Sequence, residues 1–102
     1  MVNSNNPSTE RLFRTIASIS SASECRAFLE DLCTIKEIHD MAQRLETAIL
    51  LEQGMSYQKI SEQVGVSTAT ISRVNRALLY GYDGYRAVID KMKETEKQND
   101  DQ

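Results

Sequence analysis

The spacing of aliphatic residues between Tyr57 and Leu78 constrains the fold more than any other feature of this chain. A single glycine, Gly65, interrupts an otherwise helical pattern there, and glycine suits a turn that leaves helical dihedral angles because it has no Cβ. Ser56 and Ser67 precede the two halves and can cap two short helices. Helices that cross steeply at such a turn need aliphatic side chains at fixed positions, which are filled by Ile60, Val64, Val66, Ile71 and Val74. The pattern therefore predicts a helix-turn-helix over residues 57–78.

Helical periodicity continues on the N-terminal side of this unit. Residues 1–8 are polar and include Pro7, so we expect a disordered arm there and a first helix from Thr9. The run Ser20-Ser21-Ala22-Ser23 interrupts the pattern, and we expect Ser23 to cap a second helix. The apolar faces of these two helices comprise Leu12, Phe13, Ile16 and Ile19, then Cys25, Phe28, Leu29 and Leu32.

A longer helix precedes the two short ones. Thr34, followed three residues later by Glu37, fits a capping box, and Gly54 ends the helix as a C-terminal glycine does. Asp83 can cap a last helix, so the domain covers residues 9–94 and a charged tail covers residues 95–102. No segment alternates with period two, which predicts six helices and no sheet. The expected inward residues are Ile38, Met41, Ala42, Leu45, Ala48 and Ile49 on the long helix, and Tyr85, Val88, Ile89 and Met92 on the last.

Composition narrows the class of protein. A chain of 102 residues, 40% of them hydrophobic, can form one domain with a small core, and chains of this size often complete their core by dimerising. No segment approaches the roughly 20 apolar residues of a membrane span. The N-terminus lacks the charged-then-apolar pattern of a signal peptide. We therefore expect a cytoplasmic protein without a membrane segment.

The titratable residues do not predict a metal site or a catalytic site. Cys25 and Cys33 lie eight residues apart, about 12 Å if they share a helix, which is too far for a disulfide. The single histidine, His39, has no second imidazole beside it to support a metal or acid–base chemistry. The acidic residues form no fixed triad. We expect reduced thiols, no metal, no catalytic residue and no enzyme activity.

The second short helix presents small polar groups and arginines on its outer face. Those outer residues are Ser67, Thr68, Ala69, Ser72, Arg73 and Arg76. Short side chains permit close approach to base edges, and hydroxyls can bond several bases. A helix N-terminus favours a phosphate. The pattern predicts a helix that binds the major groove of double-stranded DNA.

Local charge supports this interpretation although the whole chain has a net charge of -3. Residues 57–78 contain Lys59, Arg73 and Arg76 against Glu62, which gives this segment a net charge of +2. DNA affinity depends on local phosphate contacts, because the Debye length is only about 8 Å at physiological salt. The acidic balance of the chain therefore does not exclude DNA binding.

The residues leave other functions open. Ser67 could serve only as a helix cap and the arginines only as solubilising charges. The unit could also bind another protein, or belong to a DNA-binding accessory of a recombinase or transposase, although 102 residues leave no room for a catalytic domain. A steep salt dependence of binding would distinguish DNA binding from protein binding.

From Thr34 to about Met92 the chain resembles the tryptophan repressor superfamily, in particular its short Trp repressor-like branch in Gram-positive bacteria. The stretch that carries the resemblance is MAQRLETAILLEQGMSYQKISEQVGVSTATISRVNRAL. In it a long helix ends in a Gly-Met-Ser turn and leads directly into the two short helices. The resemblance implies an all-helical fold whose six helices interlace with a second chain into a homodimer. It also implies a transcriptional regulator, with repression the expected activity.

The resemblance assigns roles to individual residues of the two short helices. It implies base-edge contacts from Thr68, Ala69 and Ser72, and a phosphate contact from Thr70. The family carries basic side chains on the first short helix where this chain has Gln58 and Ser61, so the DNA sequence that is bound is expected to differ. The full DNA-binding set that we expect is Gln58, Ser67, Thr68, Ala69, Thr70, Ser72, Arg73 and Arg76.

The resemblance also implies a site for a small effector, L-tryptophan in the family. In the family this ligand lies between an arginine of the long helix and an arginine of the second short helix, the reading helix that contacts bases. These arginines match Arg44 and Arg73, and Thr34 contributes to the same site. Directly after the second arginine the family has glycine close to the indole ring, and this chain has Val74. A valine there fills space that the ring needs, so we expect tryptophan to bind weakly or not at all. Arg44 and Arg73 could still bind a smaller anion or contact phosphates alone, and we expect no cofactor.

Overall fold

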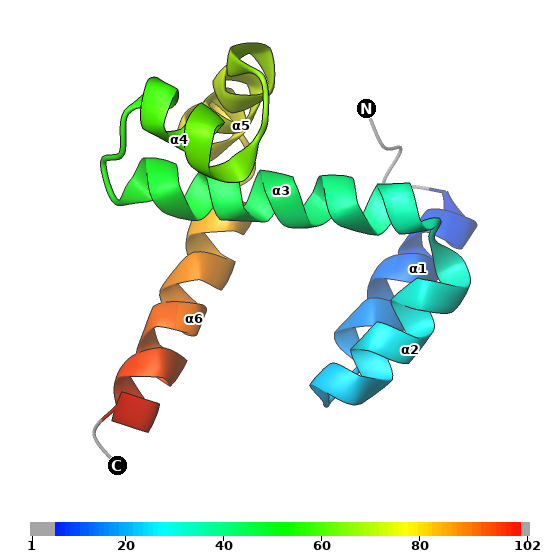
Figure 1. The fold of residues 1–102 in the computed structure, drawn as a ribbon. Coiled ribbons are helices and arrows are strands. Elements are labelled where there is room, and N and C mark those ends of the chain that lie inside the picture. The colour runs from blue at the N-terminus through cyan, green and yellow to red at the C-terminus, as the bar shows by residue number, and fades with distance from the viewer. Residues whose placement is uncertain (1–5, 101–102) are drawn as a thin grey trace. The chain divides into compact units, whose positions relative to one another are not determined.

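The computed structural model describes residues 6–100, with their side chains as far as residue 97. These residues form six helices and no strand (Figure 1), which confirms the predicted all-α class. The helices are α1 (Pro7–Ala17), α2 (Ala22–Leu32), α3 (Ile35–Glu52), α4 (Tyr57–Val64), α5 (Thr68–Tyr80) and α6 (Gly84–Asp100).

The two ends of the chain differ in part from the expected boundaries. The arm expected over residues 1–8 lies outside the described residues as far as residue 5, and α1 already begins at Pro7. Asn6 caps this helix, because its side-chain oxygen accepts the N–H of Ser8 at 2.8 Å. Proline suits the first helical turn because its missing N–H would have no helical partner there. At the other end α6 continues to Asp100, so the expected charged tail is helical where it is described, and residues 101–102 lie outside the description.

The chain divides into two compact units, Met1–Ile38 and His39–Gln102, which we describe separately. In the first unit the predicted cap of α2 was wrong. Ser21 caps α2: its backbone is extended and its hydroxyl accepts the N–H of Glu24 at 3.2 Å. Ser23 lies inside the first turn instead. A run of serines offers several equivalent caps, so composition alone does not select one.

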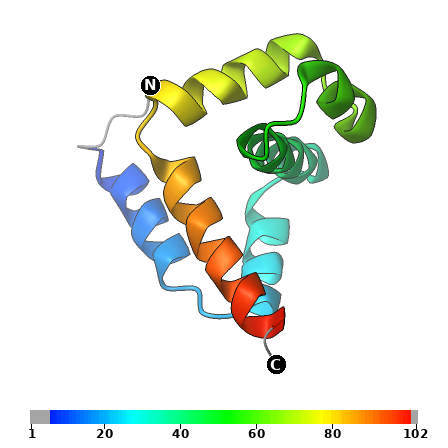
Figure 2. The same cartoon turned by 90° about the vertical axis from the view of Figure 1, so that its left-hand side faces the viewer.

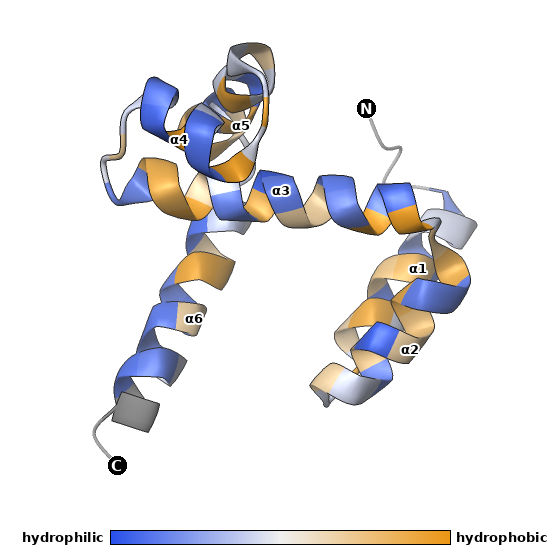
Figure 3. Ribbon diagram, viewed as in Figure 1, coloured by the Kyte–Doolittle hydropathy of each residue, from blue (hydrophilic) through white to orange (hydrophobic). Residues whose placement is uncertain are grey.

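Helices α1 and α2 carry apolar faces that the described residues bury only in part. Neither helix contains a buried residue, and Phe13 is 49% exposed. Figure 3 shows the hydrophobic residues gathered along both helices. Leu12 and Ile16 share the exposed face of α1 with Phe13. An exposed face of this kind on a short amphipathic helix is typical of an interface.

Local chemistry fixes both ends of α3. At its start the predicted capping box is present: Glu37 Oε1 accepts the N–H of Thr34 at 2.8 Å, and Thr34 Oγ1 accepts the N–H of Glu37 at 3.1 Å. At its end Gly54 is left-handed, with φ of 86°. The N–H of Gly54 donates to Leu51 O at 3.0 Å and the N–H of Met55 to Leu50 O at 3.1 Å, which is the Schellman arrangement.

The second unit has its core where α5 packs on the other helices. One cluster joins Leu50 of α3 with Ile60, Val66 and Ile71, and a second joins Ala48 of α3 with Val74 and Ile89. Figure 2 shows α3 nearly end-on, with α5 running across it and α6 leaving from the far end of α5. The core therefore holds α5 between α3, α4 and α6.

Some residues predicted to face inward do not. Val88 of α6 is 58% exposed, and Met41 and Leu45 of α3 are also exposed. Among the α6 residues whose side chains are described, Ile89 alone is buried, while Tyr85 packs at the edge of its cluster. Asp83 lies just before α6 with φ of 63°, so its backbone lacks the extended conformation typical of an N-cap. Helical spacing gives the direction of a face, but neighbours decide how much of it is buried.

Candidate nucleic-acid interface

The turn between α4 and α5 is built as the sequence predicts. Gly65 is left-handed, with φ of 84°, and its N–H donates to Ser61 O at 2.9 Å. Nothing lies within 4 Å of the place where a Cβ would be, so the backbone angle, and not crowding, favours glycine here. The small residue at position 61 has a further use, because Ser61 Oγ donates to Val66 O at 2.8 Å.

Helix α5 begins with a cap and buries one face. Ser67 is extended, and its Oγ accepts the N–H of Thr70 at 3.1 Å. The buried residues of the helix are Ile71, Val74 and Leu78. That packing leaves the opposite face to solvent.

The exposed face of α5 carries most of the side chains that the sequence proposes for DNA binding. No acidic residue occurs on α5, and its first turn is free of side chains larger than threonine. Because the first N–H groups of a helix carry partial positive charge, this end is suited to a phosphate as well as to base edges. Exposed on this face are Ser67, Thr68, Ala69, Ser72, Arg73 and Arg76, with Thr70 half-buried beside them.

Helix α4 contributes one basic side chain, Lys59, where α5 contributes two. Gln58 is exposed, and its side-chain amide lies 3.4 Å from Glu62 Oε1, to which it donates. Lys59 is also exposed and borders a hollow of about 420 Å³ at the start of α4. Lys59 was not among the residues predicted to bind DNA, although its place in the first turn of α4 is a signal for a phosphate contact.

A small pocket lies beside the middle of α5 and is lined by both arginines that the resemblance assigns to the effector site. It measures about 200 Å³ and is lined by Arg44, Thr70, Arg73, Val74, Ala77 and Tyr85. Val74 is 3% exposed and packs with Ala48 and Ile89. The valine is therefore both a wall of the pocket and part of the core.

Tyr85 lines this pocket and Thr34 does not. Tyr85 was expected to face inward but not to line a pocket; its position just after the α5–α6 turn is the only sequence signal for it. Thr34, the third residue expected at an effector site, lies in the other unit, where its hydroxyl caps α3.

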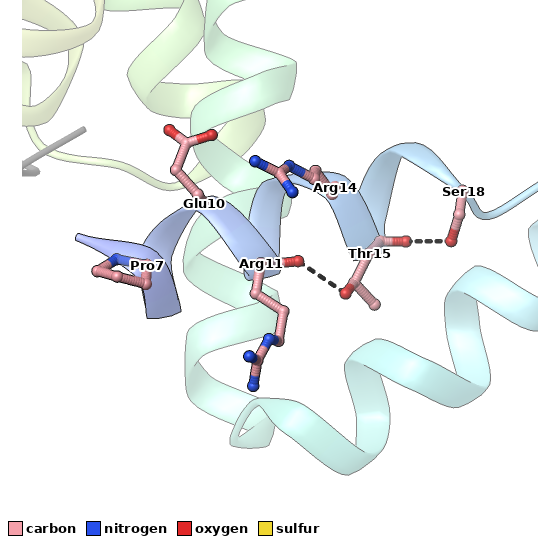
Figure 4. Close-up of a pocket in the computed structure, with 6 residues that line it drawn as sticks. All are labelled: Pro7, Glu10, Arg11, Arg14, Thr15 and Ser18. Atoms are coloured by element: carbon pink, nitrogen blue, oxygen red, sulfur yellow. Dashed lines mark hydrogen bonds between the residues drawn. The ribbon is translucent and has the colours of Figure 1, made fainter. Parts of the chain in front are cut away.

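A hollow in the first unit offers less chemistry. It extends along α1, measures about 600 Å³, and is lined by residues of that helix (Figure 4). Thr15 Oγ1 donates to Arg11 O at 2.7 Å and Ser18 Oγ to Thr15 O at 2.6 Å. Both hydroxyls therefore bond their own helix, and the hollow has no polar group brought from a second element.

The described residues include neither a metal-binding cluster nor a membrane-spanning helix. No group of three or more His, Cys, Asp or Glu side chains there could hold a metal ion. Cys25 and Cys33 are free and half-buried. In the same part of the chain no helix combines the length and apolar character needed to span a bilayer.

Comparison with known proteins decides the family. The sequence model for the Trp repressor protein family matches residues 8–93. The chain belongs to the Trp repressor family. This family consists of DNA-binding regulators and not of enzymes.

Individual relatives resemble the chain over nearly its whole length. The uncharacterised protein YerC of Bacillus subtilis is 50% identical over 90 residues, which cover 88% of this chain and 86% of YerC. The crystal structure of a TrpR-like protein from Eubacterium eligens superimposes with a TM-score of 0.84 at 44% identity, covering 88% of this chain and 93% of the other. A candidate Trp repressor from Staphylococcus aureus gives a TM-score of 0.83 at 40% identity, covering 87% and 89%. The Trp repressor-like fold is thus shared with solved structures.

Proposed function

We propose that this member of the Trp repressor family is a sequence-specific transcriptional regulator that acts as a repressor. The observation that carries the proposal is the exposed face of α5, which has small hydroxyl groups in its first turn, arginines beyond them and no acidic side chain. Such a face fits the major groove, where short side chains can reach base edges. A regulator of chromosomal genes would act in the cytoplasm of bacteria such as those of the relatives.

Each exposed residue has a role that follows from its size and position. Thr68, Ala69 and Ser72 are short enough for base edges, and alanine or threonine methyl groups suit the thymine methyl. Longer side chains fix the protein on the backbone, since phosphate contacts position a protein without reading sequence. In this arrangement the phosphates are bound by Arg73, Arg76, Thr70 and Gln58, with Ser67 holding the helix N-terminus in place.

The proposed assembly is a homodimer in which α1 and α2 take part. Their apolar faces are exposed in the single chain, with Phe13 49% and Leu32 52% accessible. Two copies of α5 could then enter major grooves one turn of DNA apart, about 34 Å, which a single unit cannot span. Helices α4 and α5 would act as a helix-turn-helix in each copy.

Unlike the family that it resembles, this chain is proposed to bind DNA without a small-molecule effector. The pocket beside Arg44 and Arg73 holds about 200 Å³, less than the 300 to 1,000 Å³, roughly, of small-molecule sites. Val74 closes one wall and is held in the core by Ala48 and Ile89. DNA binding is therefore proposed to need no tryptophan and no other cofactor.

Selection from randomised DNA tests the proposal. Purified protein is incubated with duplexes that contain a random central region, and bound duplexes are amplified and sequenced over several rounds at physiological salt. We expect an enriched motif with two half-sites related by a dyad. A pool that stays random after selection would contradict sequence-specific binding and favour a protein-interaction module instead.

A further inference from the structure

Two backbone carbonyls at the α4–α5 turn are bonded by side chains. Val64 is the last residue of α4, where carbonyls have no intrahelical partner, and Val66 lies in the turn. The side-chain amide of Gln43 donates to Val64 O at 3.3 Å, and Ser61 Oγ donates to Val66 O at 2.8 Å. The two bonds differ in origin, because Ser61 belongs to α4 whereas Gln43 comes from α3, 21 residues earlier in the chain.

The bond from Gln43 adds a directional contact between α3 and the C-terminal end of α4. At its first end α4 is tied to α3 by the turn that contains Gly54 and Met55. Glu52 lies nine helical steps after Gln43 on α3, about 13.5 Å, and the eight residues of α4 span about 12 Å. Helix α4 therefore runs back along α3, with its last carbonyl at the level of Gln43.

Gln43 itself is held in place. Thr47, one turn later on α3, is fully buried and donates its hydroxyl to Gln43 O at 2.7 Å. The Gln43 side chain is half-buried, where a hydrogen bond meets less competition from water than on an open surface. Apolar packing around Leu50 also reaches this end of α4, because Val64 and Val66 pack in that cluster, but apolar contacts are not directional.

We propose that Gln43 is a positioning residue for the reading helix, acting through Val64 O to set the angle of the α4–α5 turn relative to α3. The inference rests on the proposed DNA-binding function. Base contacts need correct alignment of α5, whereas non-specific binding depends on charge and tolerates a range of orientations. Loss of the Gln43 bond therefore reduces affinity for the preferred sequence and spares affinity for other DNA.

Three variants test this role. Gln43→Met keeps the length of the side chain and removes the donor without adding charge. Gln43→Lys keeps a donor of similar reach. Gln63→Met is the matched control, because Gln63 is exposed on α4. Each protein is titrated by fluorescence anisotropy against the selected duplex and a scrambled duplex, with concentrations corrected for the active fraction so that partial unfolding does not count as lost affinity.

We expect Gln43→Met to bind the selected duplex about tenfold more weakly, the effect of about one lost hydrogen bond. Its affinity for the scrambled duplex should stay within about twofold of the parent, because that binding is electrostatic. Gln43→Lys and Gln63→Met should keep the parent's ratio of the two affinities. An equal loss on both duplexes, or no loss, would overturn the inference.

Amide hydrogen exchange gives an independent readout without DNA. The N–H of Gly65, bonded to Ser61 O at 2.9 Å, should exchange faster in Gln43→Met than in the parent or in Gln63→Met. Unchanged exchange there would show that Gln43 does not hold the turn. If the unsubstituted protein bound both duplexes equally, the proposed function would fail, and the exchange result would still decide whether Gln43 holds the turn.

Discussion

Arg44 of α3 and Arg73 of α5 line the same pocket, with Val74 as part of its wall. The packing of α5 on α3 brings them together: Val74, adjacent to Arg73, lies in one cluster with Ala48, one turn beyond Arg44. The two guanidinium groups in this pocket beside α5 can bind an anion. The buried valine limits what else the pocket can hold.

L-Tryptophan should therefore bind weakly or not at all. Relative to the glycine that the family has at this position, Val74 adds three carbons to the wall of the pocket. Overfilling a fitted site in this way costs roughly 1–3 kcal/mol of binding free energy, which is up to about a hundredfold in affinity. Isothermal titration calorimetry with the folded protein measures this directly. A saturable heat at micromolar tryptophan would mean that the ligand avoids Val74, and the account of the pocket would have to be abandoned.

Substitutions on α5 should separate phosphate contacts from base contacts. Arg73→Ala should weaken binding to all duplexes alike and reduce the salt slope by about one charge. Thr68→Ala should instead reduce the preference for the selected sequence, by about 1–3 kcal/mol if a base contact is lost. Both effects are measured by anisotropy titrations at several salt concentrations.

Arg26→Ala provides the control for these substitutions. Arg26 is exposed on α2 and pairs with Glu30 at 2.8 Å within the same helix, so its loss removes one positive charge from a different helix. Its salt slope and its sequence preference should equal those of the parent. If Arg73→Ala and Thr68→Ala both bind as the parent does, α5 is not the reading helix.

The sequence was sufficient to predict the α4–α5 unit and insufficient for the contacts around it. Ser56, Gly65 and Ser67 act on their immediate neighbours, so the limits of α4 and the start of α5 follow from local chemistry. The bond from Gln43 to Val64 joins residues 21 positions apart. No local pattern marks such a contact.

Burial was the least predictable property. Val88 has the helical spacing of a core residue, yet it is exposed because the neighbours of α6 cover only the side that carries Ile89. On α1 the predicted face is present at Leu12, Phe13 and Ile16, but Ile19 lies beyond the end of the helix at Ala17, and no residue of α1 is buried. Periodicity reports which side of a helix is apolar, whereas burial depends on elements that are distant in sequence or belong to another chain.

The exposed apolar face of α1 predicts a dimer in solution. Multi-angle light scattering at tens of micromolar should give twice the mass of the 11.5 kDa chain. The double substitution Phe13→Glu and Ile16→Glu should shift the mass toward that of a monomer, because burying two carboxylates in an interface is costly. Arg14→Glu, on the same helix beside the polar hollow, should leave the dimer intact. A monomeric parent would contradict the proposed assembly.

Glu37 should contribute a small pH-dependent stability. The backbone N–H of Thr34, bonded to the Glu37 carboxylate at 2.8 Å, lowers the pKa of Glu37, and the Thr34 side chain adds to the effect. A pKa lowered by folding gives stability that is present above the unfolded value and is lost as pH falls through the folded value, here below about pH 4 to 5.

Glu37→Gln isolates this contribution, because glutamine can keep the capping bond but does not titrate. Thermal unfolding midpoints of the parent and the variant should therefore converge as the pH falls below about 4, and the parent should be the more stable at neutral pH. If the difference between the two unfolding midpoints did not change with pH, titration of Glu37 in the capping box would not be its cause.

The most direct test of the account is a comparison of affinities for two DNA sequences. Anisotropy titrations with the selected duplex and a scrambled duplex of equal length, at physiological salt and without tryptophan, measure whether the protein reads sequence. We predict that the selected duplex binds at least about a thousandfold more tightly, as specific regulators do, and that both affinities fall steeply with salt. Equal affinities for the two duplexes, or a preference that appears only when tryptophan is added, would contradict it.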